Sequence, residues 1–273
     1  MADLIAHLSL ASVLGITCAL FAPATHASDY VVMPAGKFTS VLPPVGPTQD
    51  RALAPPSVAV VSYRLREEPV TNAEFLVFVK AHPAWRRDRV ARVFADASYL
   101  SHWQWVDALG SEAAADQPVT RVSWFAASAY CESEGARLPT WYEWEYAAAA
   151  DATRADARSD SAWRNRILTW YSKPSNVPLA TIGGVPNFYG IRDVHGLVWE
   201  WVDDAGSLLV ASDSRDQDDP DKLEFCGAGA LELRDRDNYA VLMRIALLSS
   251  LKAADTTANL GFRCAIPVSG NIQ

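Results

Sequence analysis

The sequence predicts an α+β domain with little regular secondary structure. Short apolar segments with strand or helix periodicity are interleaved along the chain, and long stretches between them show no periodicity. Ten tryptophans among 273 residues would bury much area per residue, which a loop-rich fold needs for its core. The sequence has no internal repeat, and residues 28–273 are enough for one large domain.

The first 27 residues are typical of a secretory signal peptide. An apolar run from Leu8 to Phe21 precedes Pro23 and the small-residue site Thr25-His26-Ala27, and this run is too short to span a bilayer comfortably. The segment before the run carries Asp3 and no Lys or Arg, which leaves the translation start open; a buried N-terminal helix is the alternative. We therefore expect a signal peptide over 1–27 and a periplasmic domain over 28–273, without membrane insertion after processing.

The charge balance argues against two classes of partner. The chain has 24 basic and 32 acidic residues; without Asp3, 31 acidic residues remain and the net charge is −7. A protein of this charge is repelled by nucleic acid and by anionic membrane surfaces.

Strands and one helix are predicted in the first third of the chain. Residues 28–40 and 58–65 alternate as strands do, and the Pro-rich segment 43–56 between them is a loop. A helix begins at Asn72 and stops at His82, before Pro83. Residues 85–116 are irregular. In that segment we expect Tyr99, Trp103 and Trp105 as buried anchors, and Arg86, Arg87 and Arg89 as a solvated face.

Two capped helices are predicted in the centre. Ser123 can cap a helix that buries Phe125, Ala129 and Tyr130 and ends at Gly135. Thr140 and Glu143 form a Thr-x-x-Glu capping box for the next helix. Further along, we expect helix over 147–157, an acidic loop over 204–221, a strand or turn over 225–230, and a helix over 237–252 with Tyr239, Leu242, Met243 and Leu247 on one face.

Segments in this order resemble the formylglycine-generating enzyme (sulfatase-modifying factor) family. They are spread over roughly residues 30–266 and are Val31–Phe38, Glu68–Phe75, Pro118–Tyr146, the tryptophan-rich Pro186–Trp201 and Asn259–Cys264. The resemblance implies the formylglycine-generating-enzyme fold, a variant of the C-type-lectin architecture. It also implies a disulfide between Cys131 and Cys264, which leaves Cys226 as the unpaired thiol of residues 28–273.

The resemblance further implies a calcium ion near the tryptophan-rich motif. Carried over position by position, its ligands are the Asp193 and Glu200 carboxylates and the Gly196 and Val198 carbonyls, which suit the hard oxygen shell of calcium. The alternative is that Asp193 caps a turn and Glu200 pairs with an arginine such as Arg263. A second family calcium site, beginning at Asn176-Val177, looks degraded.

Formylglycine-generating enzymes bind Cu(I) through two cysteine thiolates, the soft ligands that this ion prefers. The stretch Leu231–Ser250, where the family carries them, has no cysteine, so we expect no copper. Cys226 is the candidate catalytic residue. Its alternatives are a buried cysteine that packs as a small hydrophobe, a metal ligand, or an intermolecular disulfide.

Several functional hypotheses follow, and whether the protein is an enzyme stays open. One is a periplasmic maturation or accessory protein that holds a protein or peptide partner, resembling family members found beside copper nitrite reductases in denitrification. The alternative is a divergent oxidoreductase acting on a peptide, by pyoverdine-chromophore-type oxidation or by formylglycine formation on sulfatases. A carbohydrate- or peptide-binding module is also compatible with the sequence.

Overall fold

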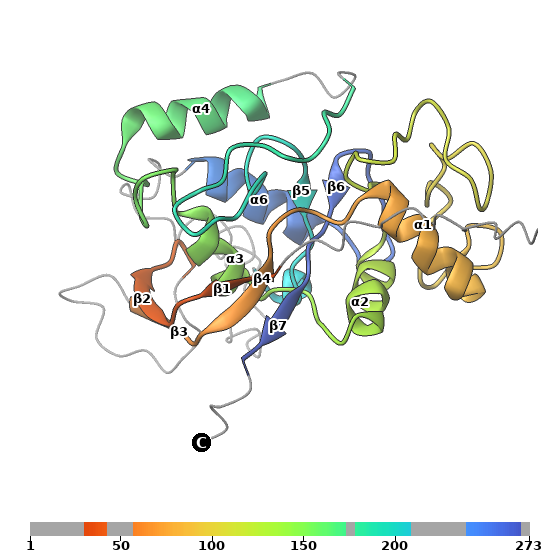
Figure 1. The fold of residues 1–273 in the computed structure, drawn as a ribbon, viewed down its shortest axis with the longest axis horizontal. Coiled ribbons are helices and arrows are strands. Elements are labelled where there is room, and N and C mark those ends of the chain that lie inside the picture. The colour runs from red at the N-terminus through yellow and green to blue at the C-terminus, as the bar shows by residue number, and fades with distance from the viewer. Residues whose placement is uncertain (1–29, 43–56, 173–177, 209–238, 269–273) are drawn as a thin grey trace, which may run out of the picture.

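A computed structural model describes residues 30–42, 57–172, 178–208 and 239–268. The predicted signal peptide, the loop 43–56, the second calcium site and Cys226 lie outside these residues. Within them the chain forms small sheets and short helices joined by long irregular segments (Figure 1). The predicted α+β architecture with little regular secondary structure is confirmed.

The main sheet joins the two ends of the described chain. Its strands, in spatial order, are β1 (Tyr30–Met33), β4 (Tyr63–Arg66) and β7 (Ala265–Pro267), and both pairings are antiparallel. Met33 opposes Tyr63, and Tyr63 also opposes Pro267. Met33, Tyr63 and Leu65 are fully buried, so the inward face of this sheet forms part of the core.

Each of the two long predicted strands is in fact a pair of short ones. Residues 28–40 contain β1 and β2 (Gly36–Thr39), and residues 58–65 span β3 (Ser57–Val60) and β4. β2 pairs with β3 in a separate antiparallel sheet, so the chain leaves one sheet for the other at residues 34–35 and 61–62. The buried positions change parity at each break, from Val58 and Val60 to Tyr63 and Leu65 and from Met33 to Phe38, a signal that the strand predictions did not use.

The predicted caps at Ser123 and Thr140 are confirmed, as is the predicted start of a helix at Asn72. The capping box of Thr71 with Glu74 was not predicted. α1 (Asn72–Ala81) and α3 (Trp141–Ala148) each begin with a complete capping box, formed by Thr71 with Glu74 and by Thr140 with Glu143. α2 (Trp124–Ser133) is capped by Ser123, and Gly135 follows it with a φ of 70°. Two short 3-10 helices are η1 (Pro83–Trp85) and η2 (Ala205–Ser207).

One other helix prediction was wrong in extent, and one helix was missed. The alanine run does not continue as helix, because α3 ends at Ala148 and the Asp151 carboxylate accepts from the backbone N–H groups of Thr153 and Arg154 at 2.8 and 2.7 Å. This local turn competes with helix. Asp160 then caps α4 (Ser161–Tyr171), which the sequence analysis did not predict.

The buried faces also differ from the predictions. α2 buries Ala126, Ala127, Tyr130 and Cys131, whereas Phe125 and Ala129 are only half-buried. α6 (Tyr239–Ser250) buries Val241, Arg244, Ile245 and Leu248, whereas Met243 is exposed. Tyr99 and Trp103 are buried anchors as expected, but Trp105 is 62% exposed.

The elements that hold the site lie together. α4 packs against α6 and runs along the top of the view in Figure 1, with β7 at the bottom. β5 (Trp199–Glu200) pairs in parallel with β6 (Leu260–Gly261), and this short pairing fixes the tryptophan-rich segment in the core. No helix in the described part of the chain is long and apolar enough to cross a membrane.

Candidate functional site

The loop before β5 is held by side-chain hydrogen bonds. The Asn187 amide donates to the Ala147 carbonyl at 2.9 Å and accepts from the backbone N–H groups of Tyr189 and Ile191 at 3.0 Å each. This loop is therefore tied to the end of α3. Gly196 follows in the left-handed region with a φ of 97° and turns the chain into β5, a conformation that glycine adopts without steric cost.

Glu200 and Arg263 form an ion pair with no solvent exposure at the base of this loop. The guanidinium binds both carboxylate oxygens, at 2.8 to 3.1 Å, and the Trp144 indole N–H donates to Glu200 Oε2 at 2.9 Å. The remaining guanidinium hydrogens go to the carbonyls of Arg66, Glu67 and Arg192. A buried pair is tolerated when its polar atoms are satisfied in this way.

A second arginine, Arg244 of α6, lies beside the pair. Its guanidinium sits 3.5 Å from the centroid of the Trp144 ring and donates to the Glu200 carbonyl oxygen. Burial lowers the pKa of Arg244 to about 10, against the opposing influence of Glu200. Because Arg244 is almost fully buried, α6 is anchored through a cation–π contact rather than through an apolar side chain alone.

The predicted calcium ligands do not form one donor set in this arrangement. Asp193 has a φ of 56°, and its carboxylate accepts from the backbone N–H groups of Gly183 and Gly184 at 2.9 and 3.2 Å. Glu200 is occupied by Arg263. No group of three or more His, Cys, Asp or Glu side chains in the described residues could hold a metal ion. These contacts fit the alternative of a turn cap and an ion pair, so calcium at Asp193, Gly196, Val198 and Glu200 stays a prediction.

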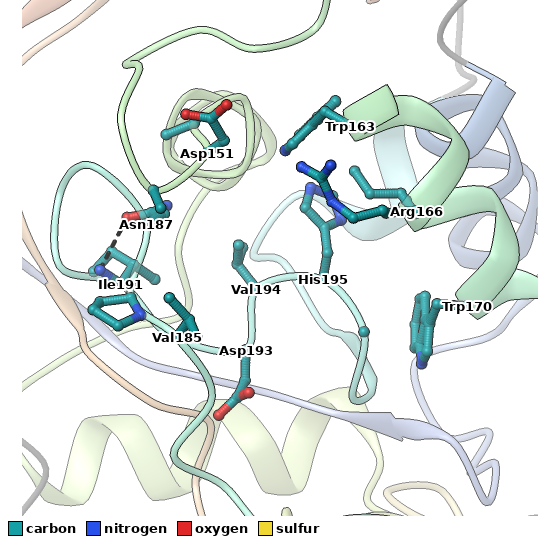
Figure 2. Close-up of a pocket in the computed structure, with 15 residues that line it drawn as sticks. Asp151, Trp163, Arg166, Trp170, Val185, Asn187, Ile191, Asp193, Val194 and His195 are labelled. Carbon is teal, nitrogen blue, oxygen red and sulfur yellow. Dashed lines mark hydrogen bonds between the residues drawn. The ribbon is translucent and has the colours of Figure 1, made fainter. Parts of the chain in front are cut away.

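A pocket of about 390 Å³ opens between α4 and the loop 185–196. Figure 2 shows side chains of both elements around it, among them Trp163, Arg166, Trp170, Val185, Asp193 and His195. Two of the residues that line the pocket, Asp193 and Gly196, belong to the predicted calcium ligands.

His195 forms part of the inner wall of this pocket. Its ring lies edge-on to Trp144 and Trp163, with centroids 5.6 Å from each, and Nε2 is 2.9 Å from the Ala148 carbonyl oxygen. A carbonyl only accepts, so Nε2 carries the hydrogen. Burial lowers the pKa of His195 to about 4, and the nearby Arg244 and Arg263 lower it further while the hydrogen bond to Ala148 opposes them. The ring is therefore neutral at pH 7, with Nδ1 as an acceptor.

The predicted disulfide between Cys131 and Cys264 is present and joins α2 to the residue before β7. Cys226 lies outside the described residues, so its predicted catalytic role stays a prediction.

Sequence reasoning missed the α4 contribution to the pocket. The missed signal was Asp160 as an N-cap, followed by apolar residues at 163, 167 and 170 with helical spacing.

These features together define a disulfide-linked α+β domain with a buried ion pair and a tryptophan-lined pocket. The chain belongs to the family of the sulfatase-modifying factor enzyme 1-like domain, whose match covers residues 18–268 and so begins inside the expected signal peptide.

Relatives in this family carry different names. The chain is 32% identical over 255 residues to "Formylglycine-generating enzyme" from Streptomyces coelicolor, covering 77% of this chain and 79% of the relative. It is 32% identical over 211 residues to "Hercynine oxygenase" from Mycolicibacterium smegmatis, covering 63% of this chain and 47% of the relative. A solved structure, "Structure of PvdO from Pseudomonas aeruginosa", matches 88% of this chain and 94% of its own, with 18% identity and a TM-score of 0.47.

Proposed function

We propose that this chain is an exported maturation or accessory protein that holds a protein or peptide partner in the periplasm. A metalloenzyme such as copper nitrite reductase is the candidate partner. One observation carries the proposal: the chain has four cysteines, Cys18 falls in the expected signal peptide, and the disulfide uses Cys131 and Cys264. Only Cys226 is left, and one thiol cannot supply the two thiolates that bind Cu(I).

Loss of activity has a parallel among the relatives. The chain is 32% identical over 160 residues to "Inactive C-alpha-formylglycine-generating enzyme 2" from Bos taurus, which covers 54% of this chain and 50% of that relative. A relative of this chain is thus named for the absence of the enzyme's activity. The proposed function does not require calcium, and the carboxylates of Asp193 and Glu200 already bind partners within the protein.

The alternative proposal is a divergent oxidoreductase that acts on a peptide and uses Cys226. The name of the relative from Mycolicibacterium smegmatis, a hercynine oxygenase, favours oxidative chemistry within the family. An oxidase of this kind would lose oxygen consumption on Cys226→Ser, whereas an accessory protein would keep its partner binding.

The test uses the exported full chain and its Cys226→Ser variant. Each is loaded with Cu(I) and incubated with oxygen and a sulfatase-derived cysteine peptide, and the aldehyde is measured by mass spectrometry. We expect no stoichiometric copper and no aldehyde above the level of free Cu(I). Binding of purified copper nitrite reductase by both proteins would support the accessory role. Enzyme-like aldehyde formation by the unaltered chain would overturn it.

A further inference from the structure

The pocket between α4 and the loop 185–196 is the size of a small ligand site. Its volume of about 390 Å³ lies in the range of roughly 300–1,000 Å³ that such sites occupy. Pockets of this kind combine an apolar lining with a few uncommitted polar groups, and those groups decide which ligand fits.

The apolar lining comes from one face of α4. Trp163, Ile167 and Trp170 follow each other at spacings of four and three residues, so they share a helix face. Trp163 is buried, and Trp170 is held against Trp199, 5.7 Å between ring centroids. Across the pocket Val185 is 82% exposed. The two indoles therefore offer a fixed wall for an aromatic or large apolar group.

Most polar side chains around the pocket are already committed. Asp151 is paired with Arg154, and the carboxylate of Asp193 binds two backbone N–H groups. The Asn187 amide is used within its own loop. Neither carboxylate is left to attract a cationic ligand.

Arg166 is different. It extends from α4 toward the pocket in Figure 2, and its guanidinium has no hydrogen bond or ion pair with any described residue. A guanidinium presents planar donors that match a carboxylate with two parallel hydrogen bonds. His195 adds an uncharged acceptor at Nδ1, since Nε2 is used by Ala148.

We propose that this pocket binds the C-terminal residue of a peptide, when that residue has an aromatic or large apolar side chain. The C-terminal carboxylate would bind Arg166, and the side chain would pack against Trp163 and Trp170. The inference deepens the proposed function and rests on it, since it names where a peptide partner is held. The lining favours this ligand over a phosphate, which has no apolar part for the two indoles.

The test is calorimetric titration of the full chain with N-acetyl-L-phenylalanine and with N-acetyl-L-phenylalaninamide. The two probes share the ring and differ in the carboxylate. We expect the acid to bind about tenfold more tightly than the amide. Arg166→Gln should remove this difference and leave both probes at the affinity of the amide. Arg92→Gln, which removes an exposed arginine outside the pocket, should preserve it.

Equal affinity of acid and amide for the unaltered chain would overturn the proposal, as would an equal loss of discrimination in both variants. The measurement needs no copper, oxygen or nitrite reductase. Aldehyde formation would therefore contradict the accessory role and leave the proposed ligand of the pocket untouched. A titration without binding would contradict the proposed ligand and would not be evidence for copper chemistry.

Discussion

The carboxylate of Glu200 connects three parts of the core. The carboxylate binds Arg263, which precedes β7, and Trp144 in α3. The backbone carbonyl oxygen of Glu200 accepts a hydrogen bond from Arg244 in α6. Removing one member of a buried ion pair leaves the other charge without compensation, which costs about 3–5 kcal/mol.

We predict that Glu200→Gln lowers the free energy of unfolding by about that amount, because the Arg263 guanidinium would keep its charge in a site without solvent. Denaturant titration measures the change. Glu67→Gln is the matched control, since Glu67 pairs with the partly exposed Arg192 and such a pair contributes about 0–1 kcal/mol. An equally small effect of Glu200→Gln would contradict the importance given to the buried pair.

The low pKa of His195 has a consequence for stability. Burial lowers this pKa from its usual 6.5 to about 4 in the folded protein. Between these pH values the unfolded chain binds a proton that the folded chain does not, so the free energy of unfolding decreases as the pH falls from 6.5 to 4. The full loss for this group is up to about 3 kcal/mol.

We therefore predict that His195→Gln has a shallower dependence of unfolding free energy on pH in this window than the unaltered chain. Urea unfolding at several pH values between 4 and 7 measures it. Some slope should remain, because burial also lowers the pKa of His102 to about 4. The prediction fails if the curves for His195→Gln and the unaltered chain are parallel.

At the level of elements, the start of a helix was predicted best where the sequence contains an N-cap residue. The predicted box at Thr140 is a local hydrogen-bond pattern, so a few residues determine it. The box at Thr71 has the same Thr-x-x-Glu spacing, although only the start of its helix at Asn72 was predicted. The face that a helix buries depends on its neighbours instead. Arg244 of α6 is buried because its guanidinium stacks on the Trp144 ring and donates to the Glu200 carbonyl oxygen. The residues next to Arg244 in the sequence indicate neither partner.

The candidate site was only partly predictable for the same reason. The sequence offers the pairing of Glu200 with Arg263, 63 residues apart, as an alternative to a calcium ligand, because both residues lie in motifs that resemble the family. The pocket could not be anticipated, since it needs α4 placed over the loop 185–196, and that placement depends on contacts with α6. Arg166, which has no partner in the described structure, gives no local signal at all.

On the scale of the whole molecule, the fold depends on contacts between distant parts of the chain. The central strand β4 lies between β1, at the start of the described chain, and β7, at its end. Arg137, after α2, exchanges backbone hydrogen bonds with Ala265 of β7 at 2.9 and 2.7 Å. The disulfide of Cys131 and Cys264 closes a separation of 133 residues beside these contacts.

We predict that the double variant Cys131→Ala/Cys264→Ala unfolds with a free energy about 4–5 kcal/mol lower, because the unfolded chain regains the entropy that a bridge over so long a loop removes. The loss is smaller if the unfolded chain stays compact. Urea unfolding with and without reductant measures both effects: reductant should destabilise the unaltered chain and leave the double variant unchanged. A reductant effect of equal size on both proteins would place the sensitivity outside this disulfide, and unaltered stability of the double variant would mean that the contacts of β7 alone hold the chain ends together.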